Sequence, residues 1–343
     1  MRIHKFQSVD AFVALDLAGA EAASGPVRWA RKILQGGAKD LARSQTYTYA
    51  ALQMRRSGAS AGINAEAPGR SEAVAAFVAE SAALVAEGTY LPDAAKGVSD
   101  QDLTPLRDGD PRNADRLDAV GAQCDGLSAA AAADAAAGLD GRTAVIEGFS
   151  ASGPALAKAV VQRGGRIVGL ATAEGSLASI DGFDPAALVD AWAEHGDKAL
   201  GALAGSDDGL GKPGALWGIG ADIVFAGSKM GIVNHGVAEG LGCQALVPSG
   251  RLAFTSKALA VCRRGDVTAV PDFVALAGSS IAAWSSPGTS DDEVHAEITG
   301  AVAALMADAL TSDDGPFLGA CYAAEAFLST WQDELPFGRP LAS

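Results

Sequence analysis

Hydrophobic and polar residues follow two different periods within residues 1–125. The segments IHKFQ (3–7) and AFVALDL (11–17) are short and partly alternating, which is typical of β-strands. Residues 71–88 (SEAVAAFVAESAALVAEG) instead repeat apolar residues at three- and four-residue spacing, with glutamates on the opposite face. This spacing predicts an amphipathic helix. The N-terminal part of the chain is therefore expected to mix strands with helices.

An alanine-rich segment separates this part from the rest of the chain. Residues 128–142 read SAAAAADAAAGLDGR. Alanine is the best helix former, and Gly138 followed by Asp140-Gly141 provides a stop signal. We interpret the segment as a helix that connects two domains rather than as a disordered linker.

From Thr143 onward, short apolar runs alternate with helical segments. The runs that predict strands are 143–148, 166–172, 221–227, 243–249 and 266–272. Strands that alternate with helices are typical of a parallel sheet covered by helices on both faces, so the fold class is α/β. Two further helices, 292–310 and 317–335, are expected to close a cleft and return to the first domain.

Length and charge narrow the classes of function. A chain of 343 residues is too long for one compact core and suits two domains. Its net charge of −15 argues against nucleic acid or an anionic membrane as a partner. The chain contains no apolar run long enough to span a membrane, and its N-terminus lacks the apolar core of a signal peptide. We therefore expect a cytoplasmic protein.

Cysteine and histidine spacing gives no sign of a metal site. The four cysteines occur without a CxxC pattern, and the four histidines occur without HxxxH or HExxH. We expect buried free thiols and no metal.

The strand at 143–148 leads into a turn suited to phosphate. The segment GFSASG places Gly148 and Gly153 at the outer positions of G-x-G-x-x-G, with Ser150 at the middle glycine position. Such a turn brings backbone close to a pyrophosphate, which lies at the N-terminus of the following helix. The pattern predicts a site for NAD or NADP. The alternative is a turn that packs a sheet and binds nothing.

The end of the next strand leaves the cofactor preference open. An acidic residue usually binds the ribose 2′-hydroxyl there, but this chain has Thr172, followed by Glu174 two positions later. Either Glu174 binds the ribose through a shifted loop, or the site prefers a 2′-phosphate, or nucleotide binding is weak.

Residues 41–63 (LARSQTYTYAALQMRRSGASAGI) form a second candidate site. A run of Arg, Thr and Tyr leads into a segment rich in Gly, Ala and Ser, which we interpret as a loop. Because Gly58 and Gly62 would cost stability in regular structure, we expect them to bring backbone close to a small ligand.

Several segments in the same order resemble the glutamate/leucine/phenylalanine/valine dehydrogenase family. GPVRW (25–29) resembles G-G-T-R, and LARSQTYTYAA (41–51) resembles L-A-R-x-M-T-Y-K-N-A. SGASAGI (57–63) resembles G-G-G-K-x-x-I, GFSASG resembles G-x-G-N-V-G, and VPDFVALAGSSIAA (270–283) resembles P-D-x-x-x-N-A-G-G-V. The resemblance covers nearly the whole chain. It implies a substrate and oligomerisation domain, residues 1–125 with 315–343, and a Rossmann-type dinucleotide-binding domain, residues 126–314.

The resemblance also implies four roles that this chain fills with other residue types. The carboxylate-binding lysine falls on Thr48, the catalytic lysine on Ser60, the aspartate on Ala95 and the substrate-contacting asparagine on Leu276. Losing a general acid–base group typically lowers a rate by ~10²–10⁴-fold. We therefore expect the ordinary amino-acid chemistry to be lost.

Neighbouring polar residues are candidates for relocated roles. The candidate catalytic residues are Tyr47, Thr48, Ser60, Asp93 and Lys96, and the candidate substrate-binding residues are Tyr49, Gly58 and Leu276.

Three functions remain open. The first is an NAD(P)-dependent oxidoreductase acting on a C–N bond, with an amine, imine or unusual amino acid as its small-molecule substrate. The second is a non-redox lyase or cyclase that reuses the cleft. The third is a silent homologue that binds a metabolite or a partner. The resemblance implies a homo-oligomer.

Overall fold

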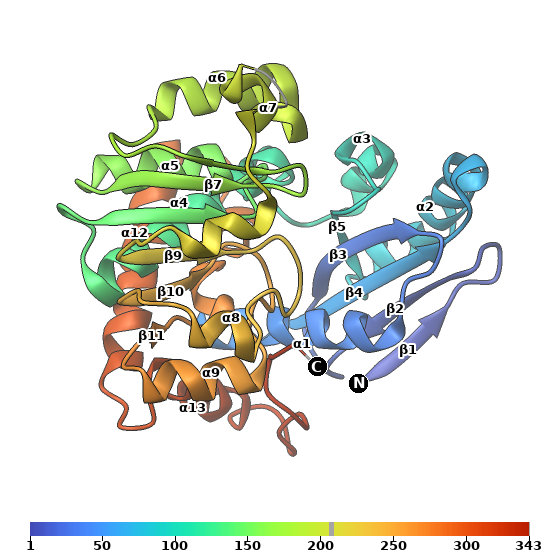
Figure 1. Ribbon diagram of the computed structural model, residues 1–343. Helices are drawn as coiled ribbons and strands as arrows, with labels where there is room; N and C mark the ends of the chain where they lie inside the picture. Colours follow the sequence, from blue (N-terminus) through green and yellow to red (C-terminus); the bar gives the residue numbers. More distant parts are fainter. Residues whose placement is uncertain (206–208, 343) are drawn as a thin grey trace.

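The computed structural model describes residues 1–205 and 209–342 and contains two separate β-sheets (Figure 1). The first sheet, in the order β1-β2-β4-β3-β5, consists of β1 (Arg2–Lys5), β2 (Ala11–Leu15), β3 (Ala23–Ala30), β4 (Ser57–Asn64) and β5 (Leu91–Ala94). The second sheet, in the order β11-β10-β9-β6-β7-β8, consists of β6 (Thr143–Glu147), β7 (Arg166–Ala171), β8 (Ser176–Ala178), β9 (Ile223–Ala226), β10 (Ala245–Pro248) and β11 (Thr268–Ala269).

The first sheet is mixed, and one of its strands was expected to be a loop. β4 pairs antiparallel with β2 and parallel with β3, so the segment 57–63 lies inside the sheet rather than in a loop. Small residues are required there because α1 (Gln35–Ala51) packs against β4. A side chain at Gly58 would overlap the carbonyl oxygen of Ala42 in α1. The prediction of a loop was wrong, and close packing of a helix on a strand explains this glycine.

The second sheet confirms the predicted parallel arrangement. β6, β7, β9, β10 and β11 run parallel to one another, and only the edge strand β8 is antiparallel, to β7. All five segments predicted as strands from Thr143 onward contain a strand.

Thirteen α-helices within the described residues accompany the sheets. Besides α1, they are α2 (Arg70–Ala86), α3 (Asp100–Leu103), α4 (Ala119–Ala137), α5 (Gly153–Gln162), α6 (Pro185–His195), α7 (Ala199–Ala204), α8 (His235–Glu239), α9 (Ser256–Arg264), α10 (Asp272–Ala275), α11 (Gly278–Ala283), α12 (Asp291–Leu310) and α13 (Pro316–Leu328). α2 confirms the amphipathic helix predicted over 71–88. None of the helices in residues 1–205 and 209–342 is long and apolar enough to cross a membrane.

The alanine-rich helix α4 is packed on several sides rather than free as a linker. It contacts α5, α10, α11 and α12, and its alanines 129–133 are buried. Backbone approaches backbone closely on both sides of Asp125: a side chain at Gly126 would overlap Ser152, and one at Gly278 would overlap the carbonyl of Cys124. The predicted end of this helix at Gly138 is confirmed, because Gly138 is the residue that ends α4, with φ of 70°.

The two halves of the fold are joined along α1 and the C-terminal helix. α1 contacts β4 of the first sheet as well as α10 and α13, and α13 also contacts α12 (Figure 1). The C-terminal helix therefore packs against the helix that covers the first sheet. The domain boundaries inferred from the sequence remain predictions.

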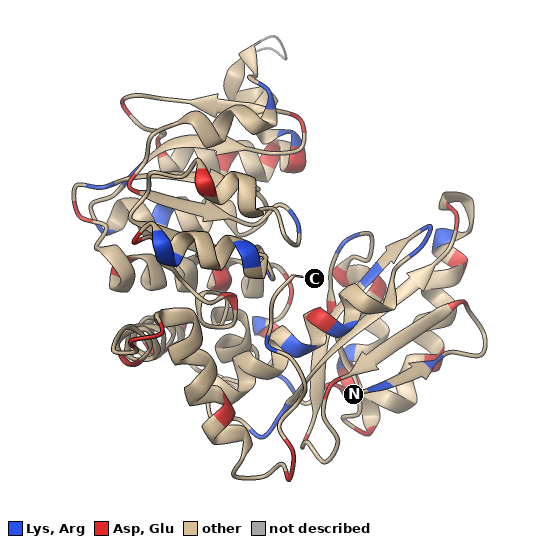
Figure 2. Cartoon of the chain, turned by 60° about the horizontal axis from the view of Figure 1, so that its bottom comes forward, with Lys and Arg blue, Asp and Glu red and all other residues tan. Residues whose placement is uncertain are grey.

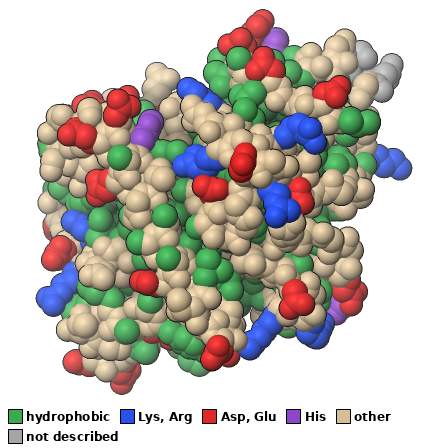
Figure 3. All heavy atoms as spheres, turned by 90° about the vertical axis from the view of Figure 1, so that its left-hand side faces the viewer, with side chains coloured by type: hydrophobic (Ala, Val, Ile, Leu, Met, Phe, Trp, Pro, Cys, Tyr) green, Lys and Arg blue, Asp and Glu red, His purple; other side chains and the backbone are tan. Residues whose placement is uncertain are grey.

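Charged residues are spread over both halves (Figure 2). On the face drawn in Figure 3, acidic and basic side chains are interspersed among hydrophobic ones. The four cysteines are buried and unpaired, as predicted.

Candidate functional site

A cleft of about 1250 Å³ lies between the two sheets. One wall comes from the first sheet and α1, and we call it the first wall. The other comes from the second sheet with the turn that follows β6, and we call it the second wall. The residues of α4 and α11 that line the cleft close its inner end.

The turn after β6 provides the second wall with small residues and free backbone amides. Gly148 has φ of 84°, and a side chain there would overlap the backbone amide of Ser228, which follows β9. Within the described residues, the amides of Ser150, Ala151 and Ser152 donate to no other group, while Gly148, Ser150 and Ser152 all line the cleft. Gly153 begins α5 and packs against the ring of Phe149 instead of lining the cleft.

This turn fits a dinucleotide pyrophosphate. Free amides at the start of a ten-residue helix, beside small side chains, provide donors and a favourable dipole for an anion. Ser150 is exposed and its hydroxyl lies 3.4 Å from that of Ser152, so it can donate toward a ligand.

The adjacent loop carries the two residues considered for ribose recognition. Thr172 and Glu174 both line the cleft, and the Thr172 hydroxyl accepts a hydrogen bond of 3.2 Å from the amide of Glu174. Glu174 is exposed, so its carboxylate is accessible from the cleft.

The first wall is built by alternate residues of β3. Ser24, Pro26 and Arg28 line the cleft, as expected for every second residue of a strand. Asp93 and Lys96, predicted as candidates, also line the cleft, and Lys96 is exposed.

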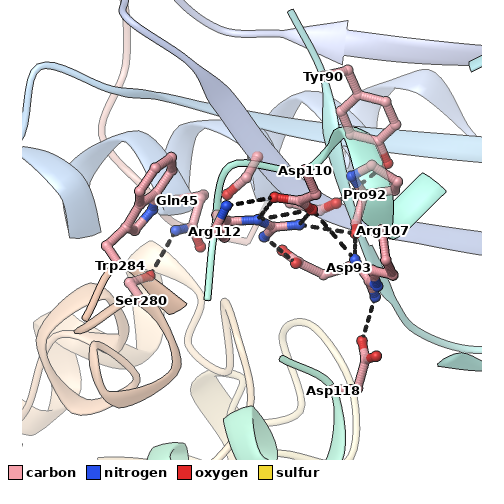
Figure 4. A network of polar contacts seen from close by, with 12 residues as sticks. Gln45, Tyr90, Pro92, Asp93, Arg107, Asp110, Arg112, Asp118, Ser280 and Trp284 are labelled. Carbon is pink, nitrogen blue, oxygen red and sulfur yellow. Dashed lines mark hydrogen bonds and ion pairs between the residues drawn. The ribbon is translucent and has the colours of Figure 1, made fainter. Parts of the chain in front are cut away.

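A saturated cluster of charges supports this wall (Figure 4). The guanidinium of Arg112, which is 6% exposed, donates to Asp110 at 2.7 Å, to Asp93 at 2.5 Å and to the carbonyl of Pro92 at 3.1 Å. Burial alone would lower the pKa of Arg112, but Asp93 and Asp110 raise it above its ordinary value. The hydrogen bonds from Arg112 in turn outweigh burial and hold the pKa of Asp110 below its ordinary value. Asp93 is therefore held in an ion pair.

Four of the candidates in α1 and β4 are enclosed away from the cleft lining. Tyr47 is 1% exposed and donates to Glu325 of α13 at 2.9 Å; burial, and then the charge of Glu325, raise its pKa. Thr48 and Ser60 are fully buried, and the Ser60 hydroxyl has no hydrogen-bond partner among the described residues. Gly58 lies beneath α1, as described above.

Two other candidates do reach the cleft. The Tyr49 hydroxyl shares a 2.5 Å hydrogen bond with Ser24 and accepts one of 3.1 Å from the indole of Trp284. Leu276 lines the cleft at the end of α10.

Sequence reasoning missed a basic residue beside Thr48. Arg251, in the segment after β10, donates to the Thr48 hydroxyl at 3.1 Å and, more weakly, to the carbonyl of Leu276 at 3.4 Å. It lines the cleft and joins the second wall to α1. A cation therefore lies next to position 48, although it comes from a residue about 200 positions further along the chain.

An acidic residue at the inner end of the cleft was missed as well. Asp125 of α4 lines the cleft and accepts a hydrogen bond of 2.8 Å from the amide of Ser279 at the start of α11. Burial raises its pKa to about 6, although Arg251 and Ser279 oppose this shift. No motif in the sequence marks Asp125, since its partners come from distant elements.

Comparison with known proteins gives a family match over more than half of the chain. The model of the glutamate/leucine/phenylalanine/valine dehydrogenase family matches residues 115–308. No curated protein matches the sequence significantly.

Solved structures of dehydrogenases share the fold. The Leu-bound form of the hetero-hexameric glutamate dehydrogenase from Thermus thermophilus is 20% identical with a TM-score of 0.76, covering 92% of this chain and 83% of that one. L-tryptophan dehydrogenase from Nostoc punctiforme is 15% identical with a TM-score of 0.66, covering 96% and 95%. Glutamate dehydrogenase from Peptoniphilus asaccharolyticus is 11% identical with a TM-score of 0.66, covering 94% and 87%. These structures confirm the predicted two-domain α/β fold with a Rossmann-like domain.

Proposed function

Because the chain belongs to the glutamate/leucine/phenylalanine/valine dehydrogenase family, we propose that it is an NAD(P)-dependent oxidoreductase acting on a carbon–nitrogen bond. The observation that carries this proposal is the turn at Ser150–Ser152, whose free amides open into the same cleft as the polar residues of the first wall. A dinucleotide held there would lie opposite a substrate held by Ser24, Tyr49 or Arg251.

The chain's own residues supply binding and orientation. A bound nicotinamide cofactor would supply hydride chemistry. Gly148 keeps the turn close to Ser228 after β9, the amides of residues 150–152 would bind the phosphates of a bound dinucleotide, and Thr172 and Glu174 would contact its ribose. Tyr49 and Ser24 form a hydrogen-bonded pair that can orient a polar group of the substrate.

The substrate proposed is an amine, an imine or an unusual amino acid rather than leucine, phenylalanine or glutamate. Thr48 and Ser60 are buried and neutral, and Ala95 on the cleft surface has no side-chain charge. Arg251 supplies the cation nearest to Thr48, but its guanidinium already donates to three neutral oxygens. Because the cation near position 48 comes from Arg251 rather than from a lysine in α1, it would meet the substrate from another direction. We therefore expect a substrate other than the three common amino acids. We also propose self-association, which the family membership supports.

The first experiment is a fluorescence titration with NADH and NADPH. We expect saturable binding of at least one, and loss of that binding in Ser150→Asp, because a carboxylate in the turn would repel phosphate. Ser71→Asp, an exposed change on α2 outside the cleft lining, is the matched control. Absence of binding by the wild type at millimolar cofactor would remove the redox proposal and leave the non-redox enzyme or the silent binding protein.

The second experiment measures oxidation of a panel of primary amines and amino acids with NAD⁺ and NADP⁺. We expect no turnover of leucine, phenylalanine or glutamate, and turnover of at least one amine. Rates of ~1–10³ s⁻¹ on those three amino acids, ordinary for an enzyme, would contradict the diverged substrate.

A further inference from the structure

Asp125 is the acidic residue of the inner cleft that remains open to a ligand. It shares one face of α4 with Gly121 and Ala122, and all three line the cleft. Its Oδ1 accepts from the amide of Ser279 at 2.8 Å, and the Ser279 side chain further stabilises the ionised form, whereas Oδ2 is not enclosed. The carboxylate is thus fixed at one oxygen and available at the other.

The other acids of the inner cleft are already engaged. Asp93 accepts from Arg112 at 2.5 Å, and Asp118 accepts from Arg107 at 2.6 Å. Both carboxylates are therefore already used in ion pairs with a guanidinium. Asp125 has no such direct hydrogen bond from a cation within the described residues.

The charges around Asp125 come from both walls. Arg251, after β10, favours its ionised form, and Asp93, on β5, disfavours it. Arg116 lines the same cleft, but its guanidinium donates to Asp291 and to the carbonyl of Thr289 rather than to Asp125. Burial outweighs these charges and places the pKa of Asp125 at about 6, close to neutral pH, where a proton-transfer group is most effective.

Resting on the proposed function, we propose that Asp125 is the residue that exchanges a proton with the substrate nitrogen. In the direction of oxidation, an N–H bond of the substrate ammonium breaks and an O–H bond forms at Oδ2. The ammonium becomes a neutral amine, and the carboxylate becomes a carboxylic acid. No electrons are transferred in this step. In the opposite direction the protonated carboxyl returns the proton to nitrogen.

Asp125→Asn keeps the shape and the acceptor for Ser279 but cannot take up a proton. We expect kcat/KM for the amine that the wild type oxidises to fall by ~10²–10⁴-fold. The rise of kcat/KM with pH near 6 should disappear, while the Kd for dinucleotide stays within about twofold. Asp125→Glu should keep part of the rate and the pH dependence. Asp134→Asn, on the same helix but outside the cleft lining, is the matched control.

A readout without turnover follows the carboxyl itself. Carbon-13 NMR of aspartate-labelled protein, compared with Asp125→Asn, should assign a titration near pH 6 to Asp125. Titration near pH 4 would overturn the inference, as would an Asp125→Asn enzyme within tenfold of wild type that keeps its pH dependence. Either result leaves the proposed function standing. Dinucleotide binding without turnover of any amine in the panel would overturn the proposed function and this inference together.

Discussion

The two walls of the cleft use different means to present polar groups. The second wall relies on backbone: a turn of small residues whose free amides lie at the start of α5. The first wall relies on side chains, with Arg112, Asp93 and Asp110 bonded to one another. Backbone donors depend on local chain geometry, whereas the charged cluster depends on residues from several loops. A short sequence motif therefore predicts the second wall, whereas no short motif predicts the first wall.

The largest expected effect breaks the first wall. Arg112→Leu leaves Asp110, whose side chain is 2% exposed, with only the longer contact of 3.4 Å from Arg107 in place of the 2.7 Å pair with Arg112. Removing one partner of a buried ion pair typically costs about 3–5 kcal/mol, measured here as the free energy of unfolding in urea. Arg31→Leu is the matched control, since its pair with Glu66 is exposed and should contribute at most about 1 kcal/mol. Equal effects of the two variants would contradict the account of the cluster.

The next effect breaks the second wall. Gly148→Ala combines a positive φ with overlap on the Ser228 amide. Gly288→Ala separates the effect of the positive φ from the effect of steric overlap, because Gly288 has φ of 83° but open space around it. We expect Gly148→Ala to destabilise the fold by about 1–3 kcal/mol more than Gly288→Ala, from overpacking. It should also weaken dinucleotide binding, whereas Gly288→Ala should not. Thermal unfolding measures the stability of the two variants, and the NADH titration measures their affinity for dinucleotide.

A third effect lies where the walls meet. The pKa of Asp125 is raised from 3.8 to about 6, so the folded state binds this proton more tightly than the unfolded state. The resulting stabilisation is complete below the unfolded pKa and is lost as pH rises through 6. Asp125→Asn should therefore be more stable than wild type at pH 8, by about 1–3 kcal/mol after allowing for its partial exposure. The difference should close as pH falls toward 4 in urea titrations at each pH. A gap independent of pH would contradict the raised pKa.

The smallest effect concerns the ribose end of the second wall. Because Thr172 replaces an acid, we expect the wild type to favour NADH over NADPH by less than ~100-fold, about 2.7 kcal/mol. Glu174→Gln should improve NADPH relative to NADH by up to ~10-fold by removing charge near the 2′-phosphate. Asp181→Asn, exposed and outside the cleft lining, should leave the ratio unchanged. Fluorescence titrations of the wild type and the two variants with NADH and with NADPH give the six dissociation constants.

The sequence predicted those parts of the fold that depend on neighbouring residues. Period and stop signals were sufficient for β6, α5 and β7, and Gly138 marked the end of α4. The segment 57–63 was predicted to be a loop because Gly and Ala are uncommon in strands, and it forms a strand only because it pairs with β2 and β3.

The inner end of the cleft could not be predicted from local patterns. Asp125, Arg251 and Ser279 come from α4, the segment after β10 and α11, and their contacts exist only in the folded chain. Candidates taken from the resemblance at Thr48 and Ser60 proved to be buried, and that depends on how α1 packs on β4.

The tight backbone contacts around Asp125 determine which part of the protein it moves with. Residues on either side of it touch the turn after β6 and the start of α11 without intervening side chains. Asp125 and the free amides of that turn therefore belong to one closely packed unit, whereas Ser24 and Arg28 belong to the other sheet. If the angle between the sheets changes, the distance from Asp125 to the nucleotide turn stays fixed while its distance to β3 changes. In the proposed reaction, a substrate held on β3 would then reach Asp125 and the dinucleotide in the same movement.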